Sequence, residues 1–183
     1  MSAPAERRGG FAVGLVGGGM IGGATGFPND ALKIDRDEFR TDTGASFGGA
    51  GSLWVGGALS DWLVFGVGGH GGALVNGDYS TTFGALAFHV DVFPAYAAGG
   101  VWQDIGLMLE PGVGLSDTKR KDDDSLVVES GGGSRLSLGL FYDGFRLSKI
   151  STGPIAAFDM MWSPSSFRPT GWIGWRTALY TSP

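Results

Sequence analysis

The sequence has no cysteine and only two histidines among its 183 residues. Without thiols the chain has neither a disulfide framework nor a thiolate metal site, and it can cross an oxidising compartment without forming stray disulfides. No stretch of about 18 apolar residues occurs, which excludes a transmembrane helix. The net charge of −5 disfavours a nucleic-acid partner, and the one basic block, residues 119–121, is followed directly by three aspartates.

The first residues also lack an export signal. Residues 1–8 contain no apolar core of the kind that a secretory signal needs. We therefore expect the printed sequence to begin at the mature protein, with Met1 added, and residues 1–9 to form a disordered or periplasmic tail.

Large apolar residues alternate with small or polar ones along most of the chain. In residues 85–92 one parity holds Leu, Phe, Val and Val, whereas the other holds Ala, Ala, His and Asp. Residues 136–140 and 171–179 repeat the pattern. A period of two predicts β-strands with one apolar face and one small or polar face. Because no helical segment is available to cover the apolar faces, a sheet closed on itself with that face toward lipid satisfies every strand together.

We therefore predict an all-β fold, a single domain over residues 1–183 built as an eight-stranded antiparallel up-and-down transmembrane β-barrel. The expected strands cover residues 10–20, 44–58, 62–75, 80–93, 102–115, 128–141, 151–162 and 170–181. The 35 glycines fit this architecture, since the interior of an eight-stranded barrel is only just wide enough for side chains. The long charged connections, residues 21–43 and 116–127, fall at one end, which predicts that they lie outside and that both termini are periplasmic.

Aromatic residues near the expected strand ends predict interfacial girdles. They are Trp54, Trp62, Phe93, Tyr96, Trp102, Phe141, Tyr142, Trp162, Trp172 and Tyr180. The alternative is that these rings fill the core of an ordinary β-sandwich.

If the large apolar residues face lipid, the charged residues of the strands lie on the opposite face and point into the barrel. The polar network expected in the lumen consists of His70, His89, Asp91, Asp104, Glu110, Arg135, Asp159 and Arg176. A hairpin centred near residues 122–123 sets Glu110 across from Arg135, and one centred near residues 167–168 sets Asp159 across from Arg176. Since buried charges require partners or water, we interpret the set as salt bridges that plug the barrel; a proton or ion path is the alternative.

Two short motifs suggest a nucleotide site and a metal site, but the residues around them do not fit either kind of site. Residues 17–22, Gly-Gly-Gly-Met-Ile-Gly, match a dinucleotide-binding fingerprint, but the glycines and proline that follow cannot begin the helix that this motif requires. Asp122, Asp123 and Asp124 lack the alternate spacing of a calcium loop. We expect neither a cofactor nor a metal.

A lipid-modifying enzyme would need a histidine with a serine and an acid. His70 has no suitably spaced serine or acid, and His89 shares a face with Asp91 but has no evident nucleophile. We therefore expect no enzymatic activity.

Residues 83–94, 112–115 and 174–180 carry a family resemblance. They resemble the small eight-stranded outer-membrane barrels of Gram-negative bacteria, of the OmpA and OmpX type, and in detail barrels of glycine-rich, high-GC lineages such as myxobacteria. The resemblance implies a location in the bacterial outer membrane, contact with outer-membrane lipid and lipopolysaccharide, and insertion by the barrel-assembly machinery. That machinery reads an aromatic residue at the end of the last strand, here Tyr180.

The resulting expectation is a non-enzymatic outer-membrane protein with a plugged lumen. Its role would be structural or would depend on binding by the loops of residues 21–43 and 116–127, whose ligand the sequence does not identify. The alternative is a soluble or secreted β-barrel that holds a small apolar ligand, with its large residues facing inward. The membrane barrel would place an arginine at Leu86 or Leu138 in lipid, whereas the soluble barrel would bury it in the ligand cavity.

Overall fold

The computed structural model describes residues 7–182, and within them eight long strands dominate. They are β1 (Gly9–Gly22), β4 (Ser46–Ser60), β5 (Leu63–Val75), β6 (Tyr79–Val92), β7 (Ile105–Arg120), β9 (Gly133–Tyr142), β11 (Ile150–Trp162) and β12 (Ser166–Ser182). The connections hold β2 (Thr25–Gly26), β3 (Thr41–Asp42), β8 (Leu126–Glu129), β10 (Phe145–Leu147) and three 3₁₀ helices, η1 (Asp37–Phe39), η2 (Tyr96–Ala98) and η3 (Gly100–Asp104). Among the described residues no helix is long and apolar enough to cross a membrane.

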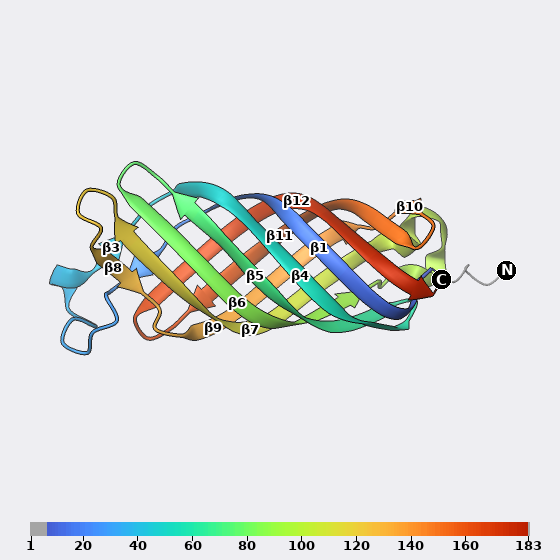
Figure 1. Ribbon diagram of the computed structural model, residues 1–183, viewed down its shortest axis with the longest axis horizontal. Coiled ribbons are helices and arrows are strands. Elements are labelled where there is room, and N and C mark those ends of the chain that lie inside the picture. Colours follow the sequence, from blue (N-terminus) through green and yellow to red (C-terminus); the bar gives the residue numbers. More distant parts are fainter. Residues whose placement is uncertain (1–6, 183) are drawn as a thin grey trace.

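The eight long strands close into one barrel (Figure 1). Each pairs antiparallel with the next long strand along the chain, and β1 pairs with β12 to complete the ring. The predicted all-β, eight-stranded, antiparallel up-and-down barrel is confirmed, and each expected strand overlaps an observed one.

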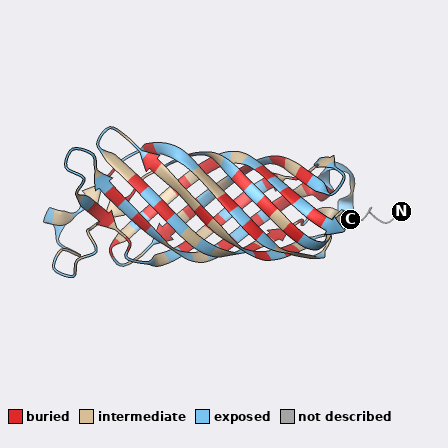
Figure 2. Cartoon of the chain, viewed as in Figure 1, coloured by how far each residue is buried: buried red, intermediate tan, exposed pale blue. Residues whose placement is uncertain are grey.

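Side chains alternate between the two faces of the wall, which gives the chequered burial pattern of Figure 2. Large apolar residues point outward: the exposed fraction of Leu86 is 71% and that of Ile173 is 72%. In contrast Trp54 and Met108, on the inward parity, are buried. The soluble alternative required large residues inside and polar residues outside, so the orientation of the wall contradicts it. An apolar outer face on a closed sheet is the form in which β-strands cross a bilayer.

The two ends of the barrel differ in their connections (Figure 1). The end that carries both termini has short turns and the segment of residues 93–104, which contains η2 and η3. The opposite end, which we name the loop end, carries the connections of residues 23–45 and 121–132. Since transmembrane barrels have short periplasmic turns and longer extracellular loops, this arrangement fits a loop end on the outside.

The aromatic girdle prediction is half wrong. Trp162 is exposed at the end of β11 as expected, and Trp62 and Trp102 are exposed in connections at the end near the termini. Five of the ten residues instead face the lumen and are buried: Trp54, Phe93, Phe141, Trp172 and Tyr180. Trp54 and Trp172 also lie inside β4 and β12, away from the strand ends where the prediction placed them. For all five, the parity of the position along the strand decides which face the side chain occupies.

Candidate functional site: a polar network in the barrel lumen

All eight residues predicted for the lumen are buried, and their exposed fractions do not exceed 6%. Six of them join one connected network: His89, Asp91, Glu110, Arg135, Asp159 and Arg176. Asp104 belongs to a separate cluster near the termini, and His70 takes no part in any ion pair among the described residues.

At the end near the termini the network begins at Asp143, which follows β9. Its Oδ2 accepts hydrogen bonds from Ser151 Oγ at 2.8 Å and from Tyr180 Oη at 3.4 Å. Arg176 Nε lies 3.5 Å from Asp143 Oδ1, and Arg176 Nη2 donates to Asp91 Oδ2 at 2.7 Å. Because Arg176 is on β12 and Asp91 is on β6, the latter contact crosses the lumen.

His89 joins the two halves of the network. Its Nδ1 lies 2.9 Å from Glu110 Oε1, and its Nε2 lies 3.1 Å from Asp91 Oδ2. The imidazole also stacks on Trp54, with ring centroids 4.1 Å apart and planes inclined by 12°. The ring is therefore held both by its edges, through carboxylates, and by its face.

The second half extends toward the loop end. Arg135 donates from both Nη atoms to Glu110 Oε2, at 3.2 Å each, and from Nε to Asp159 Oδ2 at 2.6 Å. Arg168 Nη2 donates to Asp159 Oδ1 at 3.1 Å. The Arg168 guanidinium lies over the ring of Phe83, 3.7 Å from its centroid, where the electron-rich face attracts a cation.

The network is therefore continuous from Asp143 near the termini to Arg168 near the loop end. It contains four carboxylates, three guanidiniums and one imidazole, so the imidazole decides its net charge. A buried ion needs opposite charge and hydrogen bonds to offset its lost hydration, and each carboxylate of this network has at least one guanidinium partner.

The predicted pairings are half right. Glu110 and Arg135 form an ion pair, but diagonally, since Glu110 lies directly across from Ser137. Asp159 and Arg176 do not pair: Asp159 binds Arg135 and Arg168, whereas Arg176 binds Asp91 and Asp143.

Both hairpin centres were misplaced. Strand β7 continues to Arg120 and pairs there with β8, the first half of which the prediction placed in a loop. The last turn spans residues 163–165, ahead of the predicted centre. The Asp159–Arg176 pairing failed because Asp159 lies across from Thr170.

A second cluster closes the end near the termini around Asp104. Its carboxylate meets Arg8 at 3.0 Å, Arg146 at 3.2 Å and Arg7 at 3.4 Å. Asp61 Oδ1 accepts from the backbone N–H groups of Arg7 and Arg8 at 2.6 and 2.8 Å. Burial lowers the pKa of the Arg8 guanidinium from its usual value, while nearby anionic groups, Asp104 among them, act in the opposite direction.

The N-terminal tail was predicted to extend to residue 9. Residues 1–6 lie outside the described part of the chain. Arg7 and Arg8 pack against the barrel mouth, with the Arg8 guanidinium 3.3 Å from the centroid of the Phe93 ring, and β1 begins at Gly9. Arg7, Arg8 and Gly9, which the prediction assigned to the tail, are therefore part of the barrel structure.

His70 occupies a different setting from His89. Its ring packs beside Phe83 and Trp172, at centroid distances of 5.6 and 6.2 Å, and neither ring nitrogen has a hydrogen-bond partner within residues 7–182. Ser52 lies directly across the strand pair from His70, but no hydrogen bond joins the two side chains in the described structure. The histidine–serine pair needed to activate a nucleophile is thus not assembled here.

Sequence reasoning missed three buried charged participants, Arg8, Asp143 and Arg168, as well as the half-buried Arg7 and Arg146. The first two lie just outside the expected strands, and Arg168 fell at the predicted centre of a turn. Arg168 does share the inward parity of Trp172 and Arg176, and this was the signal that could have identified it. Over residues 7–182 no three His, Asp or Glu side chains gather in an arrangement that could hold a metal ion.

No family model matches the chain, and a search of curated protein sequences finds no match. Solved structures do match. Ail, the attachment invasion locus protein of Yersinia pestis, crystallised with the heparin analogue sucrose octasulfate, superposes with a TM-score of 0.57 at 10% identity over 92% of this chain and 99% of that one. Neisserial surface protein A superposes with a TM-score of 0.51 at 12% identity, over 92% of this chain and 96% of its own. By the closed barrel and these similarities, the chain has the fold of the small eight-stranded outer-membrane β-barrels, as the sequence resemblance implied.

Proposed function

We propose that this chain is a non-enzymatic integral protein of a bacterial outer membrane. Its lumen is closed by side chains, and its loop end serves a structural or binding role at the cell surface. The barrel-assembly machinery would insert it, and outer-membrane lipid, including lipopolysaccharide, would surround its wall.

The observation that carries this proposal is the continuous network from Asp143 to Arg168. Its ion pairs cross the lumen between opposite strands, and buried side chains such as Trp54, Met108 and Met161 occupy further inward positions. An eight-stranded barrel has an interior just wide enough for side chains. This interior therefore supports a closed lumen over a wide aqueous channel.

The loop end supports a binding role because its connections are tied together. Glu129 N–H donates to Phe27 O at 3.1 Å, which links the residue 121–132 connection to the residue 23–45 connection. Asn76 Nδ2 donates to Thr43 O at 2.6 Å, and Lys121 N–H donates to Asp78 O at 2.8 Å. Loops ordered in advance lose less conformational entropy when they bind.

Conductance measurements test the closed lumen. The folded protein, reconstituted into a planar lipid bilayer, should carry no steady current above that of the protein-free bilayer. A faster mobility of the unheated sample on a denaturing gel would show that the inserted protein is folded. A steady ohmic current from that folded species would contradict the proposal.

Cysteine labelling tests the location and the orientation of the barrel. Because the sequence contains no native cysteine, each variant has a single reactive thiol. The chain would be exported in a Gram-negative host behind a secretory signal. Asp123→Cys, at the exposed loop end, should react with a membrane-impermeant maleimide on intact cells. Ala97→Cys, exposed at the opposite end, should react only after the outer membrane is permeabilised. Equal labelling of both variants on intact cells would contradict this orientation.

A further inference from the structure

The glycines of the barrel wall fall into two groups. At inward positions such as Gly48 and Gly112, a Cβ atom would collide with the backbone of the neighbouring strand, so the fold itself requires glycine. At outward Gly69 and Gly84 the nearest atom to an added Cβ is a carbonyl oxygen 3.9 Å away. A side chain would fit there without disturbing the barrel. The packing of the barrel therefore does not require glycine at positions 69 and 84.

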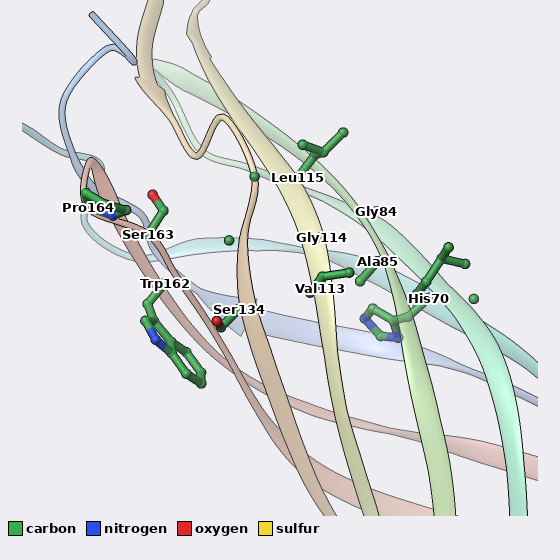
Figure 3. A pocket seen from close by; sticks show the side chains of 14 residues that line it. His70, Gly84, Ala85, Val113, Gly114, Leu115, Ser134, Trp162, Ser163 and Pro164 are labelled. Atoms are coloured by element: carbon green, nitrogen blue, oxygen red, sulfur yellow. The ribbon is translucent and has the colours of Figure 1, made fainter. Parts of the chain in front are cut away.

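These two outward glycines lie in a hollow of the lipid-facing wall, of about 1300 Å³ (Figure 3). Leu86, Val113 and Leu115 line it with side chains that are 60–71% exposed, and Trp162 lines it near the loop end. The hollow thus has apolar side chains around the bare backbone of Gly69 and Gly84, with His70 and Ala85 also in its lining.

A second hollow, of about 570 Å³, adjoins the first toward the middle of the barrel. The two share Gly69, Leu86 and Val113. The second adds Leu53 and Phe88, together with further apolar residues from β4 and β5. Together they form one apolar groove from the loop end to the middle of the wall.

The groove changes in polarity along its length. At the loop end its lining includes the hydroxyl groups of Ser134 and Ser163, whereas its deeper part is lined by apolar side chains and glycine. We propose that this groove binds an acyl chain of an outer-leaflet lipid, with the lipid headgroup at Ser134 and Ser163. This inference rests on the outer-membrane location given under the proposed function.

The shape of the groove favours an acyl chain over a second copy of the protein. Two convex barrels touch along protruding side chains, here the exposed Leu86 and Val113, and leave the backbone between them uncovered. A flexible methylene chain can enter the groove and contact the exposed backbone at Gly69 and Gly84. Dispersion contacts of this kind are individually small and add up along the chain.

Leucine substitutions at these glycines test the proposal. Gly84→Leu and Gly69→Leu each place a side chain in the groove, while Gly17→Leu and Gly171→Leu are matched controls. A Cβ at Gly17 or Gly171 has no neighbour within 4 Å, and neither residue lines the two hollows. Val113→Trp provides a second filling variant that leaves the glycines unchanged. The detergent-folded proteins would be titrated with dimyristoyl phosphatidylglycerol and the retained lipid counted by native mass spectrometry.

We expect wild type and both controls to retain one lipid with equal affinity. The filling variants should bind it about tenfold more weakly, the loss that corresponds to roughly two methylene groups leaving the groove. Equal retention by all variants would overturn the proposal in favour of unspecific annular lipid. Loss of a protein dimer, with lipid retention unchanged, would overturn it in favour of self-association. Failure of the outer-membrane location would show separately, as an unheated sample with no mobility shift or as equal surface labelling at both ends.

Discussion

The Nδ1 atom of His89 lies 2.9 Å from Oε1 of Glu110, and this contact joins the two halves of the lumen network. On one side the network reaches Arg176 through Asp91, and on the other it reaches Arg135 through Glu110. The network from Asp143 to Arg168 is thus one connected set of charges, and the loss of one member should affect several partners.

His89→Phe should destabilise the folded protein by about 1–3 kcal/mol, the cost typical of leaving a buried acceptor without its partner. The phenyl ring keeps the stack on Trp54 but donates to neither carboxylate. His70→Phe is the matched control, because His70 is also buried beside an aromatic ring but its nitrogens have no partner among residues 7–182. Urea unfolding in lipid vesicles measures both variants. Equal costs for the two would show that the His89 contacts contribute little.

Arg135→Met should cost more, about 3–5 kcal/mol, because it leaves the buried carboxylate of Glu110 without a guanidinium. The loss of volume is small, so the effect reports chiefly on charge. Arg36→Met makes the same chemical change at the exposed Arg36–Glu38 pair, where we expect less than about 1 kcal/mol. The same unfolding assay compares them. A cost for Arg135→Met as low as that for Arg36→Met would indicate that water replaces the lost partner.

The two groups of glycine predict opposite responses to alanine. Gly48→Ala places a methyl group against the carbonyl of Ala73, and such overpacking typically costs about 1–3 kcal/mol. Gly17→Ala points into free space, and it should be neutral or stabilise the protein by up to about 1 kcal/mol through the entropy of the unfolded chain. Unfolding midpoints of the two variants against wild type would decide. A destabilising Gly17→Ala would mean that the outward glycines are needed by the fold after all.

The fold could be predicted from the sequence because alternation is a local signal. Residues 85–92 show their two faces without reference to any other strand, and a wall with one apolar face and no helix to cover it has few ways to close. The same parity predicts that Glu110, Arg135 and Asp159 face inward, and all three are buried.

Register could not be predicted, because it depends on how each hairpin turns. The connection after β7 contains β8, which pairs back onto Thr118 and Lys119, and a centre guessed from loop length therefore missed the observed alignment. Contacts across the lumen, such as Arg176 with Asp91, depend on the closure of the whole barrel. No pairing of sequence neighbours predicts them.

Leu138→Arg tests the lipid-facing wall on which the proposals depend. Leu138 lies in the middle of β9 and points outward with 48% of its surface exposed. An arginine at the bilayer midplane of such a barrel costs about 2–4 kcal/mol, and the cost falls to about 0–1 near the interfaces. Thr82→Arg is the control, since Thr82 also points outward but lies near the loop end of β6. Unfolding in vesicles should therefore rank Leu138→Arg well below Thr82→Arg in stability. Similar small costs at both positions would mean that the middle of the wall is in contact with water, and the apolar outer face would then require a protein partner instead of lipid.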